Sequence, residues 1–461
     1  MYISKPYPEY KIIDLPWLDQ IPAHWKMVRI KTLLTERVEK NHPDEPLLAA
    51  TQTKGVIRKD DYENRTVLPL GDLQNLKLVK ENDFVISLRS FQGGIEYARE
   101  QGIISPAYTV LEVNNPQYHG YLSRLFKSKP FIENLTLNVT GIRQGQNIDY
   151  ERLSRSYVPL PPLEEQNAIV RYLDYMDNLI KRYIRIKKKE ILLLDEQKRA
   201  IICSTVLHRQ KDTTKVKDSG VAWIGNIPTS WRVLPGKSCF LEKKVLNTGL
   251  LIDKVLSLSY GKIIVKPEDK LHGLVPLSFE TYQIIDKGDI IVRSTDLQND
   301  QKSLRFGLCT EKGIITSAYM CLQTTNEILS EYGYYLLHTY DLLKIIYGLG
   351  SGLRQNLGWK DIKYLPCVAP PISDQQSIVG FLDNELKKYD SQIEFINKKI
   401  KFIHEYQEHL FSTLVTGALD ISDSSNNLPI DLLEEVYEIE PEEKLEVENE
   451  DESDLIEEGE E

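Results

Sequence analysis

The chain has 461 residues, a formal net charge of −11, and a composition in which 41% of residues are hydrophobic and 27% are charged. These proportions are typical of a globular protein with room for two or three domains. No apolar run approaches the roughly 18 residues that a membrane span requires, and the N-terminus lacks the apolar stretch of a signal peptide. The cysteines are scattered (Cys203, Cys239, Cys309, Cys321 and Cys367), which argues against a disulfide framework or a zinc knuckle and fits a cytoplasmic setting.

The sequence contains two long copies of one pattern. Trp17–Trp25 returns as Trp223–Trp231, and Pro161–Asp174 returns as Pro370–Asp383. Solenoid repeats have periods of about 20 to 50 residues, so this much longer repeat indicates a duplicated domain. The offset between copies varies from 206 to 214 before the paired prolines and stays at 209 after them. Because loops accept insertions and packed helices do not, each copy is predicted to be a loop-rich domain followed by a helix of fixed length.

The first part of each copy, residues 1–160 and 211–369, is predicted to be an α+β domain. Short apolar runs such as 84–88 and 289–293 are rich in β-branched residues and lie next to turn-forming residues, which is typical of strands. Residues 334–343 are a short helix candidate. The alignment of these two domains pairs Tyr121 with Tyr335, at an offset of 214.

Polar residues cluster at three turns of each copy. In the first copy they are Thr53 and Lys54; Arg89, Ser90 and Gln92; and Arg143, Gln144 and Gln146. In the second copy they are Ser259, Tyr260 and Lys262; Arg293 and Ser294; and Arg354, Gln355 and Asn356. Arginine pairs with guanine edges or phosphates, and glutamine and asparagine can bind adenine edges, so such loops suit DNA recognition. Each residue alone is more simply explained as an exposed turn residue, but recurrence at equivalent places favours a shared role.

Residues 161–210 and 370–419 are each predicted to contain one long helix. Residues 163–207 contain no proline or glycine, and residues 372–416 contain only Gly380. Apolar residues recur at steps of three, four or seven, which predicts helices of roughly 44 residues, or ~65 Å, with a narrow apolar seam. The residues predicted to pair the helices are Leu173, Ile180, Leu194, Leu382, Tyr389, Ile393, Ile396, Ile400, Ile403 and Leu410.

A narrow apolar seam requires a partner helix. The nearest candidate is the helix of the other copy, and such a pair within the chain could form a coiled coil in either direction. Antiparallel pairing would place the two domains at opposite ends of the coiled coil. The alternative is a helix that mediates homodimerisation. A basic stretch, residues 181–189, could follow DNA phosphates, although the solvated face of a coiled coil explains it as well.

The negative net charge at first argues against a nucleic-acid partner, but the acidic residues are concentrated at the C-terminus. Residues 420–461 contain 19 acidic residues and one lysine, which leaves 49 acidic and 56 basic residues in 1–419. The body is therefore positive and residues 420–461 form an acidic tail, of which 441–461 is predicted to be disordered. The tail is either a solvated segment or a polyanion that competes with DNA for the basic body.

The sequence lacks the motifs of a catalytic site. It has no phosphate-binding lysine loop, metal-binding histidine pair, nucleophile elbow or adenine-methyltransferase signature. We therefore expect no catalytic residue and no metal site in this chain.

The duplicated motifs, taken together, resemble one known family. Pro161–Gln166 and Pro370–Gln375 each open a long helix, Trp17–Trp25 and its repeat open each domain, and a Gly-x-Arg-Gln turn precedes each pair of prolines. This order resembles the specificity subunit of type I restriction-modification systems, over roughly residues 17–420.

The resemblance implies an α+β protein with two target-recognition domains, 1–160 and 211–369, held apart by two spacer helices that pair antiparallel. Each domain would read one half of a bipartite site in double-stranded DNA. Two methyltransferase subunits and the restriction and translocase subunits would be the partners, and S-adenosylmethionine, ATP and magnesium would bind to those partners. No membrane is implied.

Two other functions fit the sequence less well. A coiled-coil adaptor with two protein-binding modules would need no DNA, and salt-sensitive, sequence-selective DNA binding with partner subunits would exclude it. A complete DNA enzyme would show methyl transfer or cleavage by the purified chain.

Overall fold

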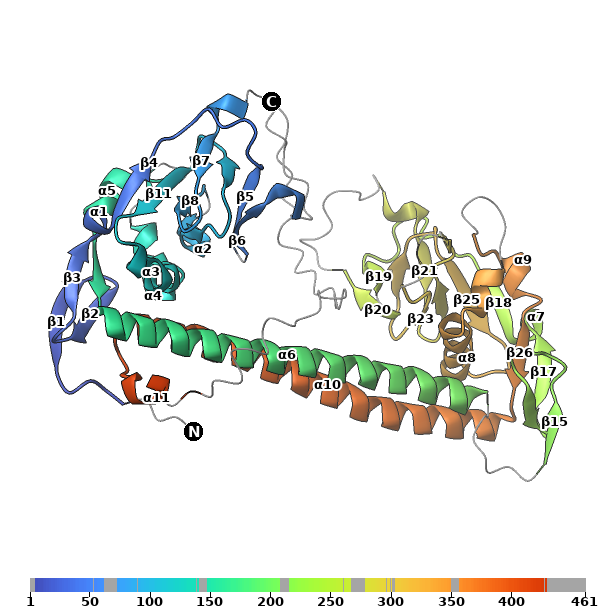
Figure 1. Cartoon of the computed structure of the whole chain (residues 1–461). Coiled ribbons are helices and arrows are strands. Elements are labelled where there is room, and N and C mark those ends of the chain that lie inside the picture. Colours follow the sequence, from blue (N-terminus) through green and yellow to red (C-terminus); the bar gives the residue numbers. More distant parts are fainter. Residues whose placement is uncertain are drawn as a thin grey trace. The chain divides into compact units, whose positions relative to one another are not determined.

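The computed structural model describes residues 5–52, 54–61, 73–88, 90–137, 139–140, 147–207, 215–259, 261–266, 278–295, 297–298, 300, 303–349, 356–426 and 428. The chain forms two compact units (Figure 1). Unit 1 comprises Met1–Lys188 and Lys398–Glu461, and unit 2 comprises Lys189–Asn397. These units differ from the consecutive segments expected from the sequence, because each long helix contributes one half to each unit.

Unit 1 is built around a four-stranded antiparallel sheet with the order β4-β11-β8-β9. The pairs β1-β2, β3-β14, β5-β6, β7-β10 and β12-β13 complete its strands. The strands are β1 (Tyr10–Leu15), β2 (Leu18–Pro22), β3 (Lys26–Arg29), β4 (Leu34–Arg37), β5 (Leu48–Thr51), β6 (Gly55–Arg58), β7 (Lys77–Val79), β8 (Phe84–Ile86), β9 (Glu96–Tyr97), β10 (Gly102–Ile104), β11 (Thr109–Val113), β12 (Val139–Thr140), β13 (Asn147–Ile148) and β14 (Tyr157–Leu160). The short helices are α1 (Ile30–Leu33), α2 (Ser90–Gly93), α3 (His119–Leu125), α4 (Lys129–Thr136) and α5 (Tyr150–Ser154), with 3-10 turns at Lys59–Asp61, Leu73–Asn75 and Pro116–Tyr118.

Unit 2 repeats this arrangement, with the sheet order β18-β25-β22-β23 and the pairs β15-β16, β17-β26, β19-β20 and β21-β24. The strands are β15 (Val216–Asp218), β16 (Asn226–Pro228), β17 (Arg232–Pro235), β18 (Phe240–Lys243), β19 (Leu256–Ser259), β20 (Lys262–Val265), β21 (Gln283–Ile285), β22 (Ile290–Val292), β23 (Phe306–Leu308), β24 (Gly313–Ile315), β25 (Met320–Thr324) and β26 (Pro366–Ala369). The short helices are α7 (Gly236–Cys239), α8 (Ser330–Leu342), α9 (Trp359–Ile362) and, in unit 1, α11 (Ser422–Asn426); 3-10 turns lie at Phe279–Thr281 and Ile345–Gly348.

The inner strands β8 and β22 of the two central sheets are buried on both faces, which explains why they are continuous apolar runs. In β8 of unit 1, Phe84 and Ile86 belong to the core on the helical side, and Val85 belongs to the core shared with the β5-β6 hairpin. In unit 2, Ile290 packs on the helical side and Ile291 on the hairpin side. Alternation along each strand therefore supplies two cores, one on either face of the sheet.

The structure corrects one alignment made from the sequence. The hydroxyl of Tyr121 donates to Pro159 O at 3.1 Å, and the hydroxyl of Tyr332 donates to the matching carbonyl, Val368 O, at 3.3 Å. Tyr121 is therefore equivalent to Tyr332 and not to Tyr335. The offset of 214 was wrong because several tyrosines lie within one helical stretch, where the sequence alone cannot separate a shift of three residues.

The two long helices are α6 (Leu163–Val206) and α10 (Ile372–Val415), each of 44 residues, as the sequence predicted. In unit 1 the amide of Gln407 donates to Asp177 Oδ1 at 2.6 Å, and in unit 2 Lys198 pairs with Asp390. Residue numbers rise along α6 as they fall along α10, so the helices pair antiparallel within each unit. Among the described residues, no helix has the length and apolar character that crossing a membrane requires.

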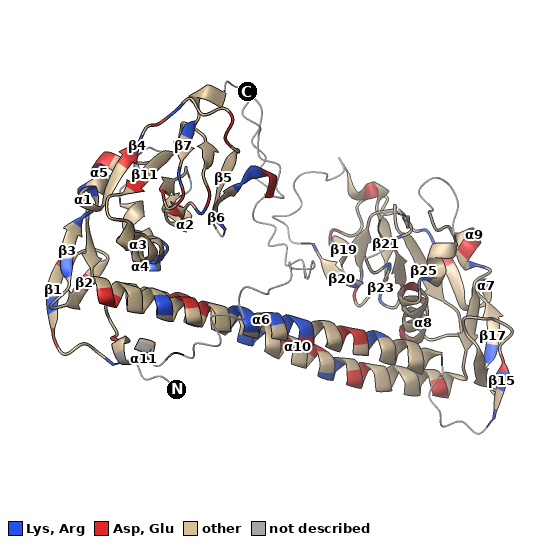
Figure 2. Ribbon diagram, in the orientation of Figure 1, with Lys and Arg blue, Asp and Glu red and all other residues tan. Residues whose placement is uncertain are grey.

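The predicted pairing residues occupy two levels of burial. Leu173, Ile180, Leu382, Ile396 and Leu410 are buried, and Leu194, Tyr389, Ile393, Ile400 and Ile403 are half-buried. The basic stretch of α6 is visible in Figure 2. Within it, Lys181 pairs with Asp177 at 2.8 Å and the Lys187 ammonium lies 5.7 Å from the ring centroid of Tyr183. These contacts lie along one helix, as on the solvated face of a coiled coil.

The repeated sequence motifs contact one another at the start of each long helix. Trp25 Nε1 donates to Glu165 Oε2 at 2.8 Å, and Trp231 Nε1 donates to Asp374 Oδ2 at 3.0 Å. The carboxylates lie in the first turn of each helix, where the helix dipole favours negative charge. The glutamine that follows each acid donates back to the first proline of its motif, from Gln166 to Pro161 and from Gln375 to Pro370. The motifs are thus the two halves of one joint between domain and helix.

The C-terminal end of α10 is part of unit 1. Gly417 ends the helix with a φ of +77°, and a Cβ there would lie 2.5 Å from Pro22 Cδ, so glycine is required. Ala418 O accepts from the Tyr10 hydroxyl at 2.9 Å, and Asp420 pairs with Lys5 in a β-bridge. The expected boundary at residue 420 is therefore not the end of the folded part, which continues through α11. The remainder of the acidic tail lies outside the described residues, as does the segment predicted to be disordered.

Candidate nucleic-acid interface

In unit 1 the predicted turns converge. Lys127 Nζ donates to Gln52 O in the first turn at 3.1 Å and to Gly93 O in the second turn at 2.8 Å. A Cβ on Gly93 would lie 2.7 Å from Gln52 Cγ, so glycine permits this close approach. Helix α2, which carries the second turn, also contacts β13, the strand that follows the third turn. One edge of unit 1 thus gathers the first two turns and the strand that follows the third turn.

The described candidates of unit 1 differ in exposure. Lys54 and Gln92 are exposed. Ser90 is fully buried, and its hydroxyl accepts from the backbone N–H of Ser87 at 2.8 Å, so in this conformation it holds the loop from within. The candidates Thr53, Arg89, Arg143, Gln144 and Gln146 lie outside the described residues.

In unit 2 the described segments next to the predicted turns also lie together. Leu357 N donates to Ser294 O at 2.8 Å, which joins the segment after the third turn to the second turn. Strand β20, which follows the first turn, contacts β23, which follows the second. A Cβ on Gly307 of β23 would lie 2.5 Å from Leu258 Cδ1 of the hairpin, so the hairpin packs directly on the strand.

The described candidates of unit 2 are partly accessible. Lys262 and Asn356 are exposed, and Ser259 and Ser294 are half-buried. The half-buried Arg293 pairs through Nη1 with Asp300 Oδ2 at 3.3 Å. The candidates Tyr260, Arg354 and Gln355 lie outside the described residues.

A buried carboxyl group, that of Glu96, lies next to Lys127 beneath the turns of unit 1. The Glu96 side chain is 1% exposed and its Oε2 lies 2.6 Å from Lys127 Nζ. Burial raises the pKa of Glu96 to about 7, and the Lys127 ammonium opposes that rise only in part. Lys127 therefore shares its protons among two backbone carbonyls and one buried carboxyl group.

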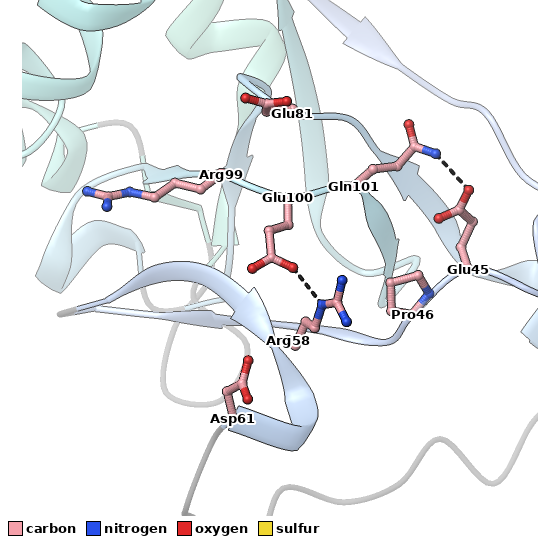
Figure 3. Close-up of a pocket in the computed structure, with 8 residues that line it drawn as sticks. All are labelled: Glu45, Pro46, Arg58, Asp61, Glu81, Arg99, Glu100 and Gln101. Carbon is pink, nitrogen blue, oxygen red and sulfur yellow. Dashed lines mark hydrogen bonds and ion pairs between the residues drawn. The ribbon is translucent and has the colours of Figure 1, made fainter. Parts of the chain in front are cut away.

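The β5-β6 hairpin also borders a cavity of about 670 Å³, shown in Figure 3. It is lined by Glu45, Pro46, Arg58, Asp61, Glu81, Arg99, Glu100 and Gln101. Arg58 Nε lies 2.6 Å from Glu100 Oε2, and Gln101 Nε2 donates to Glu45 Oε1 at 2.6 Å. Because carboxylates outnumber guanidinium groups, the cavity is poorly suited to phosphate, and it contains none of the predicted contact residues.

Among the described residues no group of three or more histidine, cysteine, aspartate or glutamate side chains is placed to hold a metal ion. All five cysteines are free thiols, and Cys239, Cys309, Cys321 and Cys367 are buried. Burial raises the pKa of Cys309 to about 11, which makes its thiol a weak nucleophile.

Sequence reasoning missed the two cations that hold the second turns, Lys127 and Arg305. Lys127 is 75 residues from Gln52, and it lies in a stretch that looks like ordinary surface helix. Arg305 lies between the apolar residues Leu304 and Phe306, and this flanking is the only local signal that its side chain is internal.

Comparison with known proteins finds similar sequences in one family. The family model "Type I restriction modification DNA specificity domain" matches residues 22–192. The putative type I restriction enzyme MjaX specificity subunit of Methanocaldococcus jannaschii is 23% identical over 66% of this chain and 68% of its own length. The MjaVIII specificity subunit of the same organism is 23% identical over 75% of this chain and 80% of its own length.

A solved structure has the same fold. It is described as the structural basis of complex assembly and conformational transition of the type I R-M system, and it matches with a TM-score of 0.60 and 13% identity over 87% of this chain and 99% of the matched chain. The fold, the joint between the repeated motifs and the sequence relatives agree. The chain is similar to the specificity subunits of type I restriction-modification systems, and residues 22–192 match the family model of their DNA specificity domain.

Proposed function

We propose that the chain directs a type I restriction-modification complex to a bipartite site in double-stranded DNA, with unit 1 reading one half and unit 2 the other. The observation that carries this proposal is that, in each unit, the described parts of the first two polar turns lie close to the segment that follows the third turn. The scaffold beneath the turns is the same in both units, whereas the side chains on them differ. Equal scaffolds with unequal turns are what two readers of different half-sites require.

The charge distribution supports the same function. Residues 1–419 have more basic than acidic residues, and a positive body attracts the DNA backbone without regard to sequence. Specificity would then come from the turns, through side chains such as Gln92, Lys262 and Asn356.

We also infer that this chain catalyses no reaction by itself and that its partners supply the chemistry. Two methyltransferase subunits would bring S-adenosylmethionine, and restriction and translocase subunits would bring ATP and magnesium, in the cytoplasm. The long helices offer docking surface, because large apolar side chains are exposed on them: Ile186, Phe402 and Tyr406 in unit 1, and Leu193 and Phe381 in unit 2.

The helices are proposed to act as spacers. Each spans ~65 Å at 1.5 Å per residue, compared with ~34–36 Å for one turn of DNA. Inserting four residues into both α6 and α10 should therefore widen the unread gap between half-sites. An unchanged gap would refute the spacer role and leave the two-reader proposal intact.

A domain exchange tests the proposal most directly. Residues 1–160 are replaced by the matching domain of another specificity subunit, and methylated adenines are mapped in a host that carries the chain with its partner subunits. One half of the modified site should change and the other half should stay the same. A change in both halves, or in neither, would contradict the proposal, and the exchange of 211–369 is the matched control.

A further inference from the structure

A fully buried arginine closes the second turn of unit 2. Arg305, at the entry to β23, is 0% exposed. Its Nη1 donates to Thr295 O at 2.6 Å and its Nη2 donates to Asp300 O. Both carbonyls belong to the segment between β22 and β23, so one guanidinium group binds the loop from inside at two places. The planar fork of arginine suits this task because its donors are fixed relative to one another.

Arg305 is itself held by α8 and by the turn after it. Its backbone N–H donates to Asp341 Oδ2 at 2.7 Å, and Asp341 is 1% exposed. The Tyr347 hydroxyl lies 3.4 Å from Nε. A buried charge is tolerated only where hydrogen bonds and counter-charges surround it, so this site is costly to build and its geometry is tightly constrained.

The loop that Arg305 closes carries a predicted contact residue. Asp300 Oδ2 lies 3.7 Å from Arg305 Nη2 and 3.3 Å from Arg293 Nη1. The backbone N–H of Arg293 also donates to Arg305 O at 2.8 Å. The buried arginine thus fixes Asp300, and Asp300 orients the half-buried Arg293.

Unit 1 reaches the same result with a different residue. Lys127 follows α3 and binds Gly93 O and Gln52 O while its charge is compensated by buried Glu96. The backbone next to Lys127 packs closely against the second turn, because a Cβ on Gly94 would lie 2.3 Å from Phe126 O. In each unit one cation, the fully buried Arg305 or the partly exposed Lys127, therefore binds backbone carbonyls beneath the predicted contact turns.

We propose that Arg305 and Lys127 are positioning residues that set DNA specificity, each only for the half-site of its own unit. Neither residue is proposed to touch DNA. Arg305 acts through Asp300 and Arg293, and Lys127 acts through the carbonyls of the first two turns. This inference rests on the proposed function, since it concerns how the readers are held in shape.

The test uses the full chain assembled with its methyltransferase subunits. The wild-type complex first defines the modified sequence, and methylation is then measured on that site and on sites with one mismatch in either half. Arg305→Met keeps the side-chain length and removes the donors. We expect discrimination against mismatches in the half read by unit 2 to fall about tenfold, a large share of what one base pair typically contributes. The other half should change by less than about twofold, because distant sites act independently.

Lys127→Met should give the mirror result, with discrimination lost only in the half read by unit 1. Lys129→Met and Arg232→Met are the matched controls, since Lys129 and Arg232 are exposed cations of units 1 and 2, and both should keep wild-type discrimination. Tyr347→Phe is a milder variant for the case in which Arg305→Met does not fold. It removes only the hydroxyl near Arg305 Nε, and it should lower discrimination against mismatches in the same half-site by less than Arg305→Met does.

The outcomes separate the inference from its premise. A variant that lowers methylation of matched and mismatched sites by the same factor would show a merely structural role and overturn the inference. Loss of discrimination in both halves would overturn it as well. If the wild-type complex modified no bipartite site, the proposed function would fail instead.

Discussion

Units 1 and 2 share a scaffold but differ in the polar groups that hold it. Both sheets pair in the same order, and each has a buried ion pair at the same place, Arg37 with Asp83 and Lys243 with Asp289. Beneath the turns the units diverge. In unit 1 the helical segment is divided into α3 and α4, and Lys127 lies between them. In unit 2 α8 is continuous, and the cation is the buried Arg305. The contacts of the domain-to-helix joint are therefore the same in both units, whereas the turns are supported by different cations.

The joint is the place where the units should be most alike. Trp25→Ala or Trp231→Ala removes a buried indole and its bond to the long helix, so each should destabilise its own unit by about 3–5 kcal/mol. Hydrogen exchange resolved by segment should show faster exchange in the altered unit alone. Trp223→Ala is the matched control, since that side chain is 37% exposed. Equal loosening of both units by either variant would contradict the comparison.

The buried ion pairs should be equivalent in position and unequal in chemistry. Asp83→Asn and Asp289→Asn each remove the buried carboxylate of the pair and leave the cation only its more exposed partners, Glu39 and Glu112 for Arg37 and Asp286 for Lys243. The cost should lie toward the lower end of the about 3–5 kcal/mol that is typical of breaking a buried pair. Arg37→Lys copies the pair of the other unit but loses the bidentate contact with Asp83, so it should cost less than Asp83→Asn. Denaturant unfolding measures all three, and Glu100→Gln, in an exposed pair, should change stability by less than about 1 kcal/mol. If Arg37→Lys lowered stability as much as Asp83→Asn does, the two ion pairs would not be interchangeable.

Unit 1 should show a pH dependence that unit 2 lacks at the matching position. The pKa of Glu96 is raised from 4.5 to about 7, so the folded unit binds more protons than the unfolded chain between these values. Stability should therefore fall as pH rises from about 4.5 to about 7, by on the order of 3 kcal/mol, and then level off. Glu96→Gln should abolish this dependence of stability on pH. If the stability of the variant and of the wild type changed with pH in parallel, Glu96 would not be the titrating group. In unit 2 the matching residue is Gly307, which has no titrating side chain.

The tyrosine equivalence gives the smallest effect. Tyr121→Phe and Tyr332→Phe each remove a buried hydroxyl that donates to a strand carbonyl, so each should cost about 1 kcal/mol. Thermal unfolding of the two variants, with Tyr364→Phe at an exposed position as the control, measures the difference. If only one of the two variants were less stable than the wild type, Tyr121 and Tyr332 would not be equivalent.

The sequence predicted the parts of the fold that depend on local pattern and repetition. The two 44-residue helices follow from periodicity and from proline-free runs, whereas their antiparallel pairing was implied by the family resemblance; the structure confirms both. The turns were located by their polar residues, but the inward orientation of Ser90 depends on packing against Ser87. Lys127 and Arg305 could not be found, because their roles arise from contacts between segments that lie far apart or within an irregular loop.

The C-terminal end of α10 has a consequence for synthesis of the protein. Tyr121, Trp25 and Tyr10 of unit 1 pack against or bind residues 414–418, which leave the ribosome some three hundred residues after Tyr121. Unit 2 lies wholly within Lys189–Asn397, so all of its residues have been made before the last part of unit 1. The domain that begins first is therefore completed last. A nascent chain that stops at Asn397 would leave Tyr10, Trp25 and Tyr121 without these contacts, so only a chain that extends past residue 418 could present two finished units.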